Sequence, residues 1–130
     1  MRVLQPAGWP RPKGYSNAIE ARGRTIFVAG LIGWNEEERF EHQDMPGQLA
    51  QILRNLVALL GEAGATPEHV VRMTWYITDK QEYLRETRQI GDVYRSIMGR
   101  AYPTMAVVQV VALLEDEAKI EIEVTAVVPD

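Results

Sequence analysis

The sequence predicts an α+β domain whose mixed β-sheet carries two helices on one face. Leucine and isoleucine recur at helical spacing from about residue 45 to 63, and a second amphipathic pattern runs from Asp79 or Lys80 to near Met98. Segments rich in β-branched and aromatic residues precede, separate and follow these helices, in the order ββαβαββ. Strands separated by a helix are joined by crossover connections, so a mixed sheet with both helices on the same face is the simplest arrangement.

The N-terminal third contains an arm, two strands and a loop. Residues 5–14 include three prolines and two glycines, which predicts an irregular arm. Residues 15–34 read as two short strands around "ARGR", with Gly23 at the turn of a β-hairpin. An acidic loop follows, and Asp44 with Pro46 after it is a typical helix start.

Three later segments predict the remaining strands. They are residues 70–78, residues 102–114 with Pro103 at the entrance, and residues 118–128. The strands at 70–78 and 105–113 place large apolar side chains on both faces, so the sheet face without helices should not stay in water. We therefore expect that face to pack against other copies of the chain in a closed homo-oligomer.

The last strand carries two carboxylates. Successive side chains of a strand point to opposite faces, which places Ile120 and Ile122 on one face and Glu121 and Glu123 on the other. The two carboxylates are then about 7 Å apart. Because the rest of this segment has the pattern of a buried strand, the two carboxylates need a polar neighbour on the second face.

Composition limits the class of protein. A chain of 130 residues, 46% hydrophobic, is the size of one domain, so we expect residues 1–130 to form a single domain. There are no cysteines and no apolar run of the roughly 20 residues that cross a bilayer, which indicates a cytoplasmic protein without membrane contact. The net charge of −4 and the scattered basic residues argue against a nucleic-acid partner. His42 and His69 are too far apart in the order of elements to suggest a metal pair.

Four segments, "GYSNAI", "IFVAGLIG", "YPTMAVVQVVAL" and "IEIEVTAVV", together span residues 14 to 128. In order and spacing they resemble the RidA/YjgF family, also called L-PSP endoribonucleases. The resemblance implies a chorismate-mutase-like fold, a homotrimer with the sheets facing inward, and a cleft between subunits that binds a small-molecule metabolite. It also implies hydrolysis of reactive enamines and imines without a metal or organic cofactor.

The resemblance carries two catalytic candidates to this chain, Tyr15 and Glu121. Tyr15 matches the family's pocket tyrosine, and Glu121 matches the glutamate that helps to place a water near the reacting carbon. Imine hydrolysis needs a water oriented at carbon and a proton supplied to nitrogen, and one carboxylate in a partly dry cleft can serve both steps. The alternatives are a solvated or salt-bridged carboxylate for Glu121 and a packed ring for Tyr15.

The chain departs from the family where polar groups are expected. Deaminating members have an arginine at the position of Met105, where it grips the substrate carboxylate through a bidentate pair. A serine before Gly30 and a glutamine after it are here Ala29 and Leu31. We expect Ala29, Gly30, Leu31 and Met105 to line the cleft, with Met105 as an apolar wall.

Two further residues are candidates for ligand contact. Trp34 could stack on a planar ligand at the mouth of the cleft, or cover the contact between subunits. Arg88 lies in the second helix where some relatives have a pocket asparagine, and it could restore a positive charge to the cleft or be a solvated helix residue.

Three functions compete at this point. The first is a cofactor-free deaminase of enamines or imines with altered substrate preference, since some family branches act on conjugated amino acids such as 2-aminomuconate. The second is a trimer that binds a small molecule without catalysis, which the missing polar groups favour. The third is the ribonuclease of the family name, against which the acidic charge and the absence of a histidine pair argue.

Overall fold

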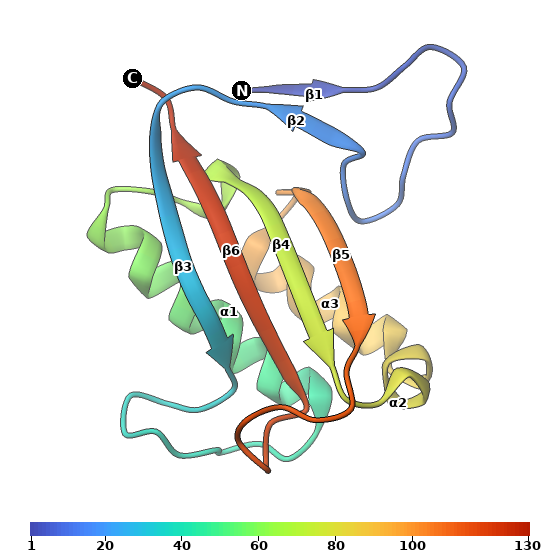
Figure 1. Cartoon of the computed structure of the whole chain (residues 1–130), viewed down its shortest axis with the longest axis vertical. Helices are drawn as coiled ribbons and strands as arrows, with labels where there is room; N and C mark the ends of the chain where they lie inside the picture. The colour runs from blue at the N-terminus through green and yellow to red at the C-terminus, as the bar shows by residue number, and fades with distance from the viewer.

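The computed structural model describes all 130 residues and has a four-stranded mixed sheet at its centre. The strand order is β3-β6-β4-β5, so β3 and β5 are the two edges. β4 and β5 run parallel, and the other neighbours are antiparallel. The helices lie behind the sheet in Figure 1, which confirms the mixed sheet with helices on one face. The strands are β3 (Arg24–Ile32), β4 (Val70–Ile77), β5 (Thr104–Gln109) and β6 (Ile120–Val128).

The predicted N-terminal hairpin is wrong. β2 (Ala18–Glu20) pairs with β1 (Arg2–Leu4) in a separate two-stranded sheet, which the sequence pattern did not predict. The arm loops out between these two strands (Figure 1). Gly23 does lie at the bend before β3, with a φ of 146°. A Cβ there would lie 2.1 Å from the carbonyl oxygen of Val128, so glycine lets the chain cross the end of β6, which is the partner of β3.

Helix α1 (Met45–Glu62) confirms the predicted first helix. The Asp44 side chain caps it by accepting a hydrogen bond from the Gly47 amide at 3.0 Å. The helix ends at Glu62, with Ala63 as its C-cap, and Gly64 follows with a positive φ of 69°. None of the helices combines the length and the apolar character needed to cross a bilayer.

The predicted second helix is divided in two, α2 (Lys80–Arg85) and α3 (Thr87–Met98). The break falls at Glu86, where the Thr87 hydroxyl bonds the carbonyls of Tyr83 and Leu84 at 2.9 and 3.0 Å. Such side-chain bonds offer the backbone an alternative to the helical pattern. A short 3₁₀ helix, η1 (Pro67–His69), precedes β4, so the chain has three α-helices instead of the two predicted.

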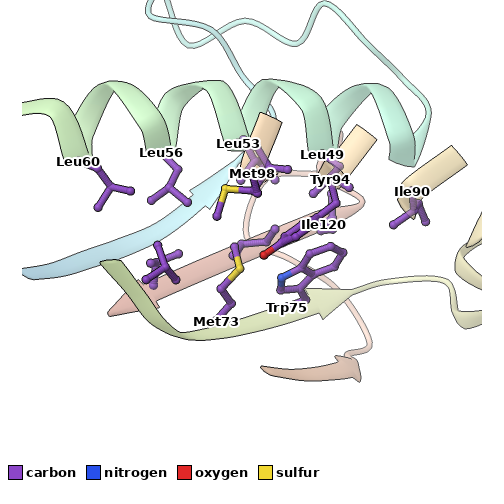
Figure 2. Packing of buried hydrophobic residues seen from close by; sticks show 14 of the residues in the cluster. Leu49, Leu53, Leu56, Leu60, Met73, Trp75, Ile90, Tyr94, Met98 and Ile120 are labelled. Atoms are coloured by element: carbon purple, nitrogen blue, oxygen red, sulfur yellow. The ribbon is translucent and has the colours of Figure 1, made fainter. Parts of the chain in front are cut away.

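The core lies between α1, α3 and the covered sheet face. Figure 2 shows the leucines of α1 pointing toward Met73, Trp75 and Ile120. The alternation predicted for the last strand is confirmed, because Ile120 and Ile122 are fully buried while Glu123 is exposed. The opposite sheet face has no cover within the chain, and there Phe27 is 79% exposed.

The buried Tyr94 makes the stability of the fold depend on pH. Burial raises its pKa well above the usual value, and the hydroxyl donates to the Ala101 carbonyl at 2.5 Å. In the unfolded chain the tyrosine hydroxyl ionises near pH 10, whereas in the folded protein it stays protonated to a higher pH. The stability that Tyr94 contributes is therefore lost as the pH rises above about 10.

We predict that the free energy of unfolding falls above about pH 10 by up to roughly 1.4 kcal/mol per pH unit from this residue. Urea unfolding at pH 9 and pH 11 measures it. Tyr94→Phe should flatten the alkaline fall, and an unchanged slope in this variant would contradict the assignment.

Candidate functional site

A cavity of about 430 Å³ opens at the edge strand β5, between that strand, helices α2 and α3 and the N-terminal arm. We call it the β5 cavity. Its volume is in the range of small-molecule sites. Met105 and Val107 reach it from β5, on the sheet face that also carries Met73 and Trp75. Five aromatic residues also line it: Tyr15, Trp75, Tyr83, Tyr94 and Tyr102.

Tyr15 is held at the cavity by the residue that follows it. The Ser16 hydroxyl donates to the Tyr102 carbonyl at 2.5 Å, and the Ser16 amide donates to the Pro103 carbonyl at 2.9 Å. These bonds attach the arm to the start of β5. Tyr15 remains 41% exposed and shares the cavity wall with Met105, so the structure brings these two predicted site residues together.

The inner wall is a group of rings. Tyr94 stacks on Tyr102 with centroids 6.3 Å apart, and Trp75 lies 6.2 Å from Tyr94. The Trp75 Nε1 is buried and has no hydrogen-bond partner in the chain, which is uncommon for an indole. Burial also raises the pKa of Tyr83. The inner wall is therefore neutral and aromatic.

Glu121 lies on the other face of the sheet. It is half-buried on β6, and no hydrogen bond or ion pair within the chain uses its carboxylate. The pairing of β3 with β6 shifts register between Val28 and Leu31, and this bulge places Gly30 against the carboxylate. A Cβ on Gly30 would lie 2.2 Å from the Glu121 Oε2, so the glycine leaves room for the acid.

We predict that Gly30→Ala displaces the Glu121 carboxylate without unfolding the sheet. The clash is with the tip of a flexible side chain, so the stability should change by less than about 1 kcal/mol. Thermal unfolding measures the stability, and ¹³C NMR of the Glu121 carboxyl group detects its new surroundings. A loss of several kcal/mol, or an unchanged carboxyl signal, would contradict this account.

Glu123 differs from Glu121 in having a partner. The Tyr76 hydroxyl donates to the Glu123 Oε1 at 2.7 Å, and this bond raises the pKa of Tyr76, with a smaller effect from the Glu121 charge. Tyr76 is directly opposite Glu121 in the β4–β6 pairing. The two carboxylates of the last strand are thus distinguished by their neighbours, and Glu121 is the unpaired one.

The remaining predicted residues lie away from the β5 cavity. Ala29 is exposed in the bulge, whereas Leu31 packs against the core. Trp34 contacts Phe40 with ring centroids 6.1 Å apart, and its carbonyl accepts from Asn55 at 2.9 Å. These two contacts stabilise the start of the acidic loop that follows β3.

Arg88 is exposed on α3 and is not part of the cavity wall, whereas Arg95 is. A long side chain on a helix leans toward the N-terminus and covers the residue about four positions earlier. For Arg95 that residue is Gly91, and the Arg95 guanidinium does lie against it. Sequence reasoning missed Arg95 and Lys13, a second cation of the cavity wall; a glycine inside a helical pattern was the available signal for the former.

Within one chain the predicted site residues form two groups. Tyr15 and Met105 lie at the β5 edge, and Gly30 and Glu121 lie at the β3–β6 side on the opposite face. Two strand spacings of about 4.8 Å separate β6 from β5. No cluster of three or more His, Asp or Glu side chains is close enough together to hold a metal ion.

The sheet order, the helices on one face and the edge cavity define a class of small α+β proteins, and comparison with known proteins identifies the family. The family model described as Endoribonuclease L-PSP matches residues 10–128. A RutC family protein of Aquifex aeolicus is 34% identical over 98% of this chain and 99% of its own length. A Rid family protein of Yersinia pestis, YyfB, has a solved structure that superposes with a TM-score of 0.85 at 33% identity, covering 98% of both chains.

The chain therefore belongs to the endoribonuclease L-PSP family, which is the RidA/YjgF family. Some relatives carry names that state an activity. The chloroplastic Reactive Intermediate Deaminase A of Arabidopsis thaliana is 31% identical over 86% of this chain, which spans 57% of that protein.

Proposed function

We propose that this protein is a cofactor-free hydrolase that deaminates reactive enamine or imine metabolites in a cleft between subunits, with Glu121 as its acid–base group. The observation that supports the proposal most is the environment of the Glu121 carboxylate. Its carboxylate has no partner in the chain, and a bulge leaves room for it on an uncovered sheet face. The name of the Arabidopsis relative supports the same reaction class.

The reaction balances with one carboxylate and one water. Glu121 accepts a proton from the water as its oxygen bonds to the imine carbon, and passes that proton to the nitrogen. The resulting carbinolamine then releases ammonia and leaves a carbonyl. Tyr15 contributes the phenol that contacts the substrate from the other wall of the cleft.

A homotrimer completes the site in this proposal. Glu121 projects from the inner strand β6 on the open face, whereas Tyr15 lies on the arm beside the edge strand β5. In this proposal a second copy therefore brings its β5 edge to the β3 side of the first. The open face supports such packing, because Phe27 and Val108 are 79% and 43% exposed there. The mass in solution tests this directly, and a chain of 14.7 kDa that stays monomeric would contradict the proposed cleft.

The substrate preference is altered relative to deaminating members. Met105 offers no charge at the place where those members hold a carboxylate, and Ala29 and Leu31 offer no hydrogen bonds. A conjugated substrate such as a 2-aminomuconate-like acid fits a wall of rings better than a short amino acid does.

Ammonia release tests the proposal. Purified protein should release ammonia from enamines generated in situ faster than solvent does, across a panel of aliphatic and conjugated compounds. No excess rate with any member of the panel would count against the hydrolase.

The alternative is a trimer that binds a metabolite without catalysis. The neutral aromatic lining of the β5 cavity favours it, because rings and Met105 bind without activating water. Tight binding of a compound that is recovered unchanged, with no ammonia from any enamine, would support this second function.

A further inference from the structure

The charged residues of the β5 cavity are both cations. Its wall contains Lys13 and Arg95 and includes no aspartate or glutamate. Lys13 comes from the N-terminal arm and Arg95 from α3, so two separate elements contribute positive charge to one cavity. An organic anion is the ligand that such a pair attracts.

Because Gly91 has no side chain, the Arg95 guanidinium can lie close to the backbone of α3. A Cβ on Gly91 would be 3.2 Å from the Arg95 Nη1 and 3.5 Å from its Nη2, so the guanidinium lies in van der Waals contact with the space above this glycine. Gly91 is itself part of the cavity wall. The glycine therefore gives the guanidinium a place at the cavity.

Asp92 is the acid that faces Arg95. Its Oδ1 lies 2.6 Å from the Nη2, and both side chains are more than half exposed. A guanidinium has five N–H donors, and this contact leaves most of them for a ligand. Lys13 makes no hydrogen bond or ion pair within the chain.

The rest of the cavity is apolar or aromatic. Met105 and Val107 form one side, and the stacked rings of Tyr94 and Tyr102 form another. Aromatic faces bind flat groups well, and offset stacking adds to simple burial. Charge and flat apolar surface thus occur in one cavity but on different residues.

We propose that the β5 cavity binds an organic acid with an aromatic or conjugated body, and that Arg95 and Lys13, instead of a group at position 105, hold its acid end. The body lies against Tyr102, Tyr94 and Met105. This inference rests on the proposed function in that it names the substrate class of the same cleft. It requires a longer molecule than a short amino acid, because the acid end and the buried body contact different residues.

Calorimetry on the intact assembly tests the proposal with three non-reacting probes: 3-phenylpropionate, its neutral amide, and propionate. The wild-type protein should bind the aromatic acid about tenfold more tightly than the amide, and propionate much more weakly than either. Arg95→Gln should weaken binding of the aromatic acid roughly five- to tenfold and leave the amide unchanged. Lys13→Gln should have a smaller effect of the same sign.

Arg88→Gln is the matched control, because it removes the same charge from the same helix outside the cavity. It should leave the affinity for the aromatic acid unchanged. Arg95→Lys keeps the charge and should retain most of the affinity, which separates loss of charge from damage to α3. Equal binding of acid and amide, no binding of either, or equal effects of Arg88→Gln and Arg95→Gln would each overturn the proposal.

The outcomes distinguish this inference from the hydrolase. Selective binding of the aromatic acid through Arg95 without ammonia release from any enamine refutes the hydrolase and leaves the anion site standing. Ammonia release from short enamines, with no preference for the aromatic acid over its amide, refutes the anion site and leaves the hydrolase standing.

Discussion

Glu121→Gln should reduce the excess rate of ammonia release by roughly 100-fold or more while the protein remains folded. Glutamine has nearly the same size as glutamate but cannot accept a proton from water. The carboxylate makes no structural bond within the chain, so its removal should leave stability almost unchanged. Initial rates with an imine generated in situ, together with thermal unfolding, measure both effects.

Glu123→Gln provides the matched control for this experiment. It lies on the same strand and the same face two residues later, but its carboxylate already accepts the Tyr76 hydroxyl. We expect this variant to keep most of the activity. If Glu121→Gln retained the wild-type rate, or if both variants lost activity equally, the assignment of Glu121 as the acid–base group would be wrong.

Leu53→Ala should lower the free energy of unfolding by about 3 kcal/mol. Leu53 is completely buried, and it points from α1 toward the sheet in Figure 2. Removing most of its side chain loses apolar burial and leaves a cavity in a closely packed core. For a chain of this size the melting temperature should fall by roughly 10 °C.

Leu59→Ala is the control on the same helix. Leu59 is 46% exposed, so truncation there should change stability by less than about 1 kcal/mol. Urea unfolding of both variants at one protein concentration gives the comparison and holds any contribution from subunit association constant. Equal destabilisation by the two substitutions would mean that the burial assigned to α1 is incorrect.

The sequence predicted those elements whose pattern repeats over many residues. The helix at 45–63 was predicted to within one residue at its end, because apolar spacing and the Asp44 cap agree. The break at Glu86 was not predicted, because it depends on the Thr87 hydroxyl bonding the preceding turn. The predicted pairing of β2 with β3 was wrong, because the sequence signals of a hairpin are local. In the structure β2 pairs with β1, and β3 pairs with β6 from the far end of the chain.

For the candidate site, the resemblance identified Glu121 and Tyr15, but the sequence did not show which arginine side chain lies at the cavity. Arg88 and Arg95 occupy similar positions on a helix pattern, but only Arg95, which lies against Gly91, is part of the cavity wall. That choice depends on where α3 packs relative to β5.

By itself, the amino-acid sequence determined the family and the two faces of the last strand, because motif order and side-chain alternation are properties of the chain. The tertiary structure alone decided that Tyr15 joins Met105 at one edge while Glu121 stands with Gly30 on the other face. The physical reason is that strand order, bulges and helix packing bring together residues that no local pattern connects.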